Sequence, residues 1–307
     1  MPNPPSATTS SEWTILRILK WADGFLKQRG IESPRSAAEI LLACALGTDR
    51  VHLYMHHDQP LEKTELARFK GFIQRRLQRE PVAYIVGRKG FWSLDLDVTP
   101  AVLIPRPETE RLVEAALAWL AVRPDDRPAR VLDLGTGSGA IVLALASEAD
   151  RHRFFASDVS PEAVGVARHN AAATGFSERV RFFVGDWLET VRPFPVFDLI
   201  VSNPPYVGTH EWTGLQPEIV RYEPRRALDG DADGLRCYRA IVGEAHRRLR
   251  PGGALMLEIG CGQRRAVVHI AEQSGAYEAY GCLKDYGGHD RVVTMRKKDV
   301  APGQKDC

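Results

Sequence analysis

The sequence predicts an α/β fold, namely a doubly wound, mostly parallel seven-stranded sheet preceded by a small helical domain. Two observations predict it. From residue 129 onward, short apolar runs alternate with stretches of helical periodicity, which is typical of strands buried between helices. Residues 12–80, in contrast, carry apolar side chains at helical spacing.

Residues 12–80 are predicted to form a small set of helices. The clearest of them is expected to begin with Ser33 as its cap and Pro34 at its first position, and to end at Gly47. Apolar stripes at helical spacing lie before and after this helix. They consist of Ile15, Ile18, Leu19, Ala22, Phe25 and Leu26 on one side, and of Leu66, Phe69, Ile73 and Leu77 on the other.

The segment 81–107 is expected to connect the helical domain to the α/β domain. Its "FWSLDLDVTP" portion alternates apolar and polar residues, which is typical of a half-exposed strand in a hairpin. Pro105 and Pro107 then prevent a helix from beginning before about Glu108.

The α/β domain is expected to span residues 108–298. Five apolar runs are predicted to be buried strands: "ARVLDL", "RFFASD", "RVRFFVGD", "FDLIVSN" and "GALMLEIG". Helices are predicted between them, near 139–148, 161–173, 232–249 and 263–274. The stretch "YEAYGCLKDYGGHDRVVTMRKK" is expected to add two strands joined by a glycine-rich turn.

Composition excludes several classes of protein. The 41 Lys and Arg nearly balance the 39 Asp and Glu, so a net charge of +2 gives no overall attraction to nucleic acid or membrane. The five cysteines lack metal-ligand spacing, so we expect reduced thiols and no metal site. No apolar run is long enough to span a bilayer, and a signal pattern is missing. We therefore expect a cytoplasmic protein, with a flexible leader at 1–11 and a flexible tail at 299–307. The sequence does not indicate an oligomeric state, and a monomer is the default expectation.

A glycine-rich loop follows the first strand of the α/β domain. Alternating glycines let the backbone turn tightly and approach a ligand. The alternative is a tight strand-to-helix turn that binds no ligand. A dinucleotide fingerprint fits only loosely. Asp133 would repel a pyrophosphate but accept hydrogen bonds from the ammonium group of S-adenosylmethionine. The loop consists of Gly135, Thr136, Gly137, Ser138 and Gly139.

The next two strands also end in polar residues. Asp158 suits the hydroxyls of a ribose, although a lone aspartate here is also a common helix cap. Asp186 can accept from an adenine amino group, and Trp187 can cover the ring, unless the pair forms an ordinary turn. Because ligands bind at the carboxyl ends of strands in such sheets, the three strand ends together favour S-adenosylmethionine.

The fourth strand ends in "NPPY", Asn203 to Tyr206. Methyl transfer demands mainly positioning, because a planar nitrogen with a delocalised lone pair is a poor nucleophile. The Asn203 side-chain oxygen and the Pro204 carbonyl can accept both hydrogens of such a nitrogen. Pro204 and Pro205 keep these acceptors rigid, and Tyr206 can provide an aromatic wall. The alternative is a stiff proline loop with a capping asparagine and no role in catalysis.

These motifs resemble a known family. "DLGTGSGAI" together with "NPPY" is similar to class I methyltransferases, with a Rossmann-like fold, that act on planar nitrogens. Four further segments resemble the release-factor glutamine N5-methyltransferases, the PrmC/HemK family. They are 80–110, 222–235, 257–263 and 289–293.

The resemblance implies methyl transfer from S-adenosylmethionine to the glutamine of the Gly-Gly-Gln loop in peptide chain release factors. It implies that the 135–139 loop, Asp158, Trp187 and Asn203 contact the cofactor, and that residues 203–206 hold the glutamine amide. The segment Arg106 to Glu110 is expected near the active cleft without a definite role. The helical domain, with the hairpin, is expected to recognise the release factor.

Three positions depart from the family pattern, and three other functions stay open. Gly90, Asp231 and Cys261 differ from the usual residues, which affects fine substrate contacts rather than the reaction. The alternatives are a nucleic-acid methyltransferase acting on adenine N6 or guanine N2, a silent cofactor-binding protein, and a nicotinamide dehydrogenase. A nucleic-acid enzyme would need an electropositive groove, which the net charge does not indicate.

Overall fold

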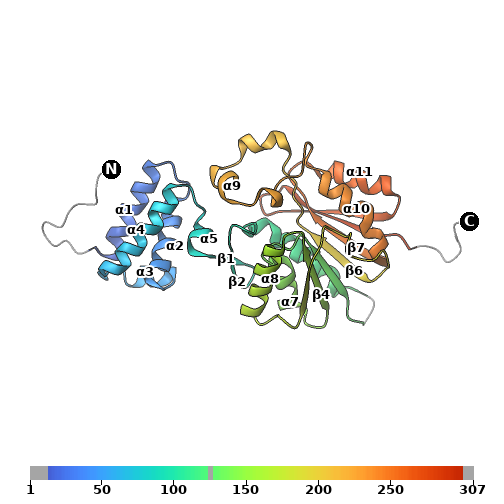
Figure 1. The fold of residues 1–307 in the computed structure, drawn as a ribbon, viewed down its shortest axis with the longest axis horizontal. Helices are drawn as coiled ribbons and strands as arrows, with labels where there is room; N and C mark the ends of the chain where they lie inside the picture. The colour runs from blue at the N-terminus through green and yellow to red at the C-terminus, as the bar shows by residue number, and fades with distance from the viewer. Residues whose placement is uncertain (1–12, 124–126, 300–307) are drawn as a thin grey trace, which may run out of the picture. The chain divides into compact units, whose positions relative to one another are not determined.

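The structure is a computed structural model that describes residues 13–123 and 127–299 (Figure 1). The expected leader and most of the expected tail lie outside these residues. Contacts divide the chain into two compact units. Of the described residues, the helical unit contains those up to Gly87 together with Pro217–Tyr222, and the sheet unit contains those of Arg88–Gln216 and those from Glu223 onward. The boundary at Gly87 falls within the expected connector 81–107, whose residues are thus shared between the units.

The helical unit contains five consecutive helices packed around one apolar core. Thr14 caps the first helix, because its side chain accepts from the Arg17 backbone N–H. Ser33 stands before the second helix, but its φ of 47° is left-handed and its side chain makes no capping bond. Gly47 ends that helix with a φ of 69°. The helices are α1 (Ile15–Gln28), α2 (Pro34–Leu46), α3 (Arg50–Met55), α4 (Lys63–Leu77) and α5 (Val82–Val86).

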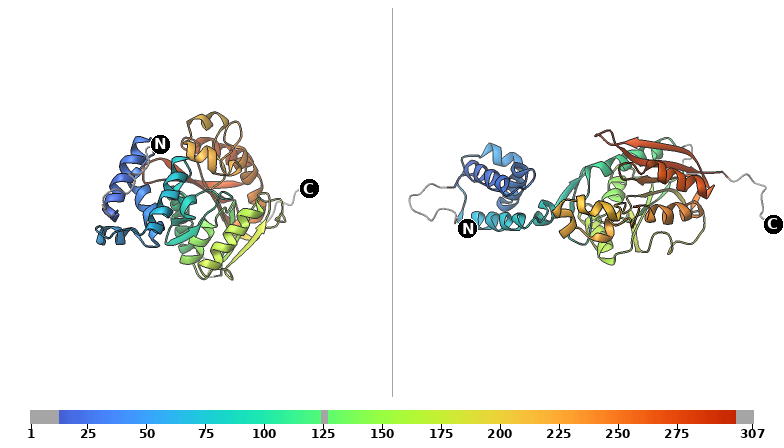
Figure 2. Two further views of the ribbon diagram at one scale, coloured as in Figure 1. Left: turned by 60° about the vertical axis from the view of Figure 1, so that its left-hand side comes forward. Right: turned by 90° about the horizontal axis from the view of Figure 1, so that it is seen from above.

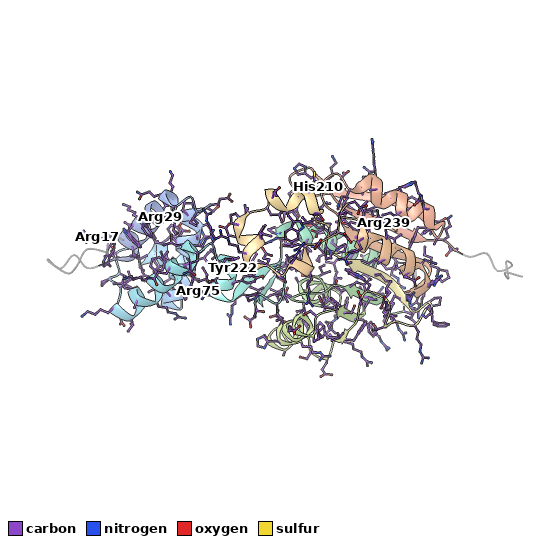
Figure 3. All side chains as sticks on the ribbon, turned by 45° about the horizontal axis from the view of Figure 1, so that its top comes forward. Arg17, Arg29, Arg75, His210, Tyr222 and Arg239 are labelled. Atoms are coloured by element: carbon purple, nitrogen blue, oxygen red, sulfur yellow. The ribbon has the colours of Figure 1, made fainter. Side chains whose placement is uncertain are left out.

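A short distant segment, α9 (Pro217–Tyr222), also belongs to the helical unit. Glu218 accepts from Arg76 at 2.7 Å and from Arg79 at 3.4 Å. The hydroxyl of Tyr222, whose side chain is labelled in Figure 3, donates to the Gln78 carbonyl oxygen at 2.9 Å. These bonds attach α9 to the end of α4.

The sheet unit is built on seven strands in the order β5-β4-β3-β6-β7-β9-β8. β9 runs antiparallel to both of its neighbours, and the other pairs are parallel. This confirms the predicted seven-stranded, mostly parallel sheet with a helical region before it. The strands are β3 (Arg130–Leu134), β4 (Arg153–Asp158), β5 (Val180–Val184), β6 (Phe197–Ser202), β7 (Leu249–Glu258), β8 (Tyr277–Lys284) and β9 (Asp290–Lys297).

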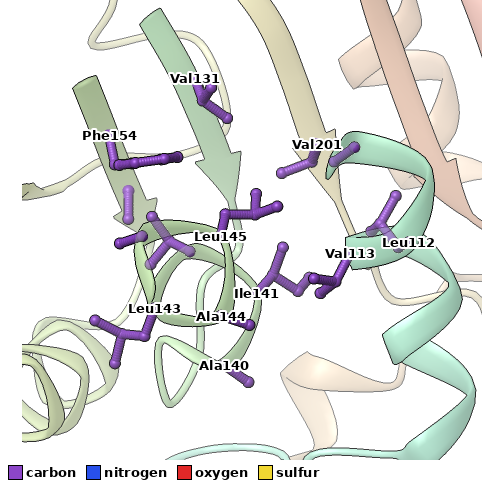
Figure 4. Packing of buried hydrophobic residues seen from close by; sticks show 14 of the residues in the cluster. Leu112, Val113, Val131, Ala140, Ile141, Leu143, Ala144, Leu145, Phe154 and Val201 are labelled. Carbon is purple, nitrogen blue, oxygen red and sulfur yellow. The ribbon is translucent and has the colours of Figure 1, made fainter. Parts of the chain in front are cut away.

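Helices cover both faces of this sheet (Figures 1 and 2). Successive strand residues point to opposite faces, so Val131 packs on one side and Leu132 on the other. On the first side, Ile141 and Val113 lie next to each other beside the strands (Figure 4). That side is covered by α6 (Glu110–Ala121), α7 (Ala140–Glu148) and α8 (Pro161–Ala173), and the other by α10 (Arg236–Arg248) and α11 (Arg264–Ser274).

A two-stranded hairpin, β1 (Arg88–Phe91) and β2 (Leu94–Asp97), packs within the sheet unit. The buried Asn170 of α8 accepts from the Asp97 backbone N–H and donates to the carbonyl oxygens of Asp97 and Ser138. One amide thus ties the hairpin to the glycine-rich loop. The 3₁₀ turns are η1 (Pro107–Thr109), η2 (Thr209–Gly214) and η3 (Arg225–Ala227). Among the described helices, none is long and apolar enough to cross a membrane.

Candidate active site

A cavity of about 450 Å³ lies in the sheet unit, at the carboxyl ends of β3, β4, β5 and β6. Its size is typical of a site for a small molecule. The strand ends meet there because parallel strands present their carboxyl ends at one edge of the sheet. Seven of the predicted site residues line it: Gly135, Gly137, Asp158, Asp186, Trp187, Asn203 and Pro205.

The glycine-rich loop fits closely against its neighbours. Gly135 has a φ of 70°, and a β-carbon there would come within 3.5 Å of the Trp187 ring. Gly139 has a φ of 85°, and its β-carbon would lie 3.1 Å from a Leu143 methyl carbon. The positive φ favours glycine at both positions, and close packing adds to this only at Gly139. Thr136, Ser138 and Gly139 themselves do not line the cavity.

Asp158 braces this loop and also lines the cavity. One carboxyl oxygen accepts from the Gly137 backbone N–H at 3.0 Å, and the other accepts from the Ser160 N–H at 2.9 Å. Burial raises the pKa of the Asp158 carboxyl, whereas these two backbone bonds lower it. The two backbone bonds thus hold its carboxyl group in place at the cavity wall.

Asp133 is fully buried and does not line the cavity. The Thr136 hydroxyl donates to its Oδ2 at 2.7 Å, while Oδ1 has no partner among the described residues. Burial raises the pKa of this carboxyl to about 7. A buried oxygen that lacks a donor is costly, so the site fits a ligand that supplies one, such as the ammonium group of S-adenosylmethionine.

The "NPPY" segment contributes Asn203 and Pro205 to the cavity wall, whereas Pro204 and Tyr206 do not line it. The Tyr206 carbonyl oxygen accepts from the Gln263 side-chain amide at 3.0 Å, which anchors the segment. Burial raises the pKa of the Tyr206 hydroxyl to about 12, so this group stays protonated at neutral pH. Its use as an aromatic wall stays a prediction.

Asp186 and Trp187 follow β5 at the cavity edge. Asp186 is exposed, and Trp187 is half-buried with a φ of 43°. A left-handed backbone is uncommon for a bulky residue and marks a turn whose shape matters. It places the indole against Gly135, at the wall of the cavity.

Several cavity residues were not singled out from the sequence. Arg226, Arg236 and Cys237 line the wall. Nearby, Arg106 pairs at 2.5 Å with Glu223, whose side chain is almost fully buried. The 222–235 segment carries a family resemblance, but nothing in its local pattern shows which of its side chains face a cavity.

Residues 17–87 match the PrmC N-terminal domain family, and residues 125–298 match a methyltransferase domain family. The chain is 45% identical over 284 residues to the "Release factor glutamine methyltransferase" of Geobacter sulfurreducens, covering 92% of this chain and 97% of that protein. The chain belongs to the release factor glutamine methyltransferase family. The relative of the same name from Moorella thermoacetica is also 45% identical, over 93% of this chain and 99% of its own length.

Membership of the release factor glutamine methyltransferase family confirms the predicted methyltransferase and its cofactor, S-adenosylmethionine. A solved structure supports the fold alone. The catalytic domain of hMettl16, in complex with the MAT2A 3'UTR hairpin 6, superimposes with a TM-score of 0.54 at 14% identity. That match covers 78% of this chain and 84% of the other.

Proposed function

We propose that the protein transfers a methyl group from S-adenosylmethionine to the side-chain amide nitrogen of the glutamine in the Gly-Gly-Gln loop of peptide chain release factors. The family relatives, named for this reaction, support it. The observation in the structure that carries it is the place of Asn203. This residue lies on the same cavity wall as the glycine-rich loop and Asp158, directly after β6.

The cofactor is proposed to lie along the four strand ends. Asp158 would accept from the ribose hydroxyls, and Asp186 from the adenine amino group, with Trp187 against the ring. Asp133 would accept from the ammonium group through its unpartnered oxygen. The cofactor then supplies an electrophilic methyl group next to Asn203. Of these groups, Asp158, Asp186 and Trp187 line the cavity, and Asp133 lies behind its wall.

Asn203 and Pro204 are proposed to hold the glutamine amide. The Asn203 side-chain oxygen and the Pro204 carbonyl accept the two amide hydrogens and turn the nitrogen toward the methyl group. Their rigidity removes orientational freedom before the reaction, which is a large part of the barrier for such a displacement. A strong base is unnecessary, because the nitrogen becomes acidic when it is alkylated.

We also propose that the enzyme acts in the cytoplasm as a monomer, and that its helical unit recognises the release factor. A nucleic-acid methyltransferase is the alternative. Light scattering of the purified protein tests the oligomeric state, because a dimer mass would contradict the proposal.

Radiolabelled S-adenosylmethionine tests the reaction. The purified enzyme is incubated with a release factor, with its variant in which the glutamine of Gly-Gly-Gln is alanine, and with total RNA and DNA. We expect label in the parent factor and none in the variant. Label in nucleic acid alone would overturn the proposed substrate.

A further inference from the structure

A buried chain of polar groups lies behind Asn203 in the sheet unit. β6 and β7 are parallel neighbours in which Ser202 pairs with Leu257, so Asn203 and Glu258 follow side by side at their ends. Thr109, at the start of α6, is 4% exposed, and Glu258 is 1% exposed. The Asn203 side-chain N–H donates to the Thr109 hydroxyl oxygen at 3.1 Å.

Thr109 does not use its hydroxyl to cap α6, although it stands at the cap position. The Glu258 carboxyl group lies close to this hydroxyl, and the interaction with Thr109 lowers its pKa. An ionised carboxylate only accepts, so the single hydroxyl hydrogen must point to Glu258. The hydroxyl oxygen is then left as an acceptor, and the N–H₂ end of the Asn203 amide must face it.

We infer that Thr109 and Glu258 are positioning residues for methyl transfer, because together they fix which end of the Asn203 amide faces the substrate. With N–H₂ turned to Thr109, the Asn203 Oδ1 is turned away from it and is available to a substrate N–H. If the Asn203 amide were reversed, its N–H₂ group would face the substrate N–H, and two donors cannot form a hydrogen bond. This inference rests on the proposed use of Asn203 as an acceptor for an amide nitrogen.

The surroundings of Glu258 determine its protonation state, and this state affects the hydrogen bonds next to Asn203. Burial raises the pKa of its carboxyl to about 7, against the interaction with Thr109 that lowers it. Glu258 Oε2 also lacks a partner among the described residues. The charged and titratable groups that act on Glu258 come from four surrounding segments: Arg106, Glu108, Tyr206, Tyr238 and Arg291.

Protonation of Glu258 would remove the constraint on Asn203. A protonated carboxyl group can donate to the Thr109 oxygen, and the hydroxyl hydrogen can then bond Asn203 Oδ1. The amide orientation is therefore defined only while Glu258 is ionised. At saturating cofactor and substrate, kcat should fall as the pH is lowered through the pKa of Glu258.

The test uses two variants of the full chain that differ in one property. Thr109→Val keeps the branched shape and removes the hydroxyl, whereas Thr109→Ser keeps the hydroxyl. We expect Thr109→Val to lower kcat about tenfold, the value of one lost hydrogen bond, with cofactor affinity unchanged within about threefold. Thr109→Ser should restore most of kcat, and Thr109→Val should lose the fall of kcat at low pH.

A second measurement is independent of the substrate. The Asn203 side-chain amide is followed by NMR through a pH titration, and its resonances should shift with the ionisation of Glu258 in the wild type but not in Thr109→Val. Asn203 resonances that still shift with the ionisation of Glu258 in Thr109→Val, or equal kcat for wild type and Thr109→Val, would overturn the positioning role. Absence of release-factor methylation by the wild type, with the NMR difference present, would overturn only the substrate.

Discussion

Two buried carboxyl groups at the site lower the stability of the fold when they are ionised. Asp133 and Glu258 are both fully buried, and each has one carboxyl oxygen without a partner among the described residues. Burial raises the pKa of each to about 7. Such groups cost stability when ionised, and perturbed carboxyl groups of this kind are typical of functional sites.

The sequence located the side chains that directly follow parallel strands, whereas their ligand-binding roles stay predictions. Asp158, Asp186 and Asn203 meet at one cavity because the register of the sheet brings their strand ends together. The sequence was a poorer guide to the positions of side chains within the loops. Whether Thr136 or Tyr206 faces the ligand depends on loop dihedrals that no periodicity encodes.

Asn203→Ala should lower turnover by at least about 10²-fold, because it removes a positioned polar group from the transition state. Cofactor affinity should change no more than about threefold, since the glycine-rich loop and Asp158 are intact. Single-turnover kinetics and calorimetric titration measure the two quantities. Turnover near the wild-type rate would contradict the proposed role of the side-chain oxygen.

Asp133→Asn should change how the stability of the ligand-free protein depends on pH. Because its pKa is about 7 when folded and about 4 when unfolded, the folded state binds this proton more tightly. The carboxyl group therefore favours folding at low pH and loses that contribution as the pH rises from about 4 to about 7. Urea unfolding should show this decline in the wild type relative to Asp133→Asn.

The same variant should bind S-adenosylmethionine more weakly, by about tenfold or more, since it removes a charged partner of the ammonium group. Asp229→Asn, an exchange outside the cavity lining, is the control. Equal cofactor affinity in the wild type and Asp133→Asn would show that the ammonium group binds elsewhere.

At the scale of elements, local patterns located most of the structure. The predicted run "RFFASD" is β4 over the same residues, and the helix predicted at 161–173 is α8. Both have clear signals, a β-branched or aromatic run and a Ser-Pro-Glu start. The Ser33 cap shows the limit: its position was predicted, but its backbone conformation prevents the capping bond.

The helix α9 was missed because its partners are distant in the chain. Glu218 and Arg76 are separated by 142 positions, and a six-residue helix has little periodicity of its own. The pair is well buried, with side chains 13% and 6% exposed. The contacts of α9 with the folded helical unit, and not its local sequence, explain why this segment is helical.

Glu218→Gln should destabilise the helical unit by about 1–3 kcal/mol, because it leaves the buried Arg76 without its carboxylate. Asp233→Asn is the matched control. Its ion pair with Arg239 is half-exposed, so the loss should stay below about 1 kcal/mol. Urea denaturation compares them, and equal losses would show that α9 contributes little to the unit.

At the scale of the whole molecule, two separate family models match the chain, one over residues 17–87 and the other over residues 125–298. The helical unit presents Val51, Tyr54 and Met55 of α3, which are 57–70% exposed. Exposed apolar side chains gathered on one helix favour contact with another protein. They provide a surface on which to test the proposed recognition of the release factor.

Combined Val51→Glu and Met55→Glu should raise the KM for intact release factor about tenfold, because charges replace apolar contact area. The kcat at saturation should stay within about twofold. Val122→Glu, at an exposed apolar position of the sheet unit, is the control. An unchanged KM in the double variant would exclude α3 from substrate recognition.

The most direct measurement is peptide mass spectrometry of a release factor treated with S-adenosylmethionine and either wild-type enzyme or Asn203→Ala. We expect the added mass of one methyl group on the glutamine of the Gly-Gly-Gln peptide with the wild type, and almost none with the variant. A methyl group on any other residue, or equal methylation by both proteins, would contradict it.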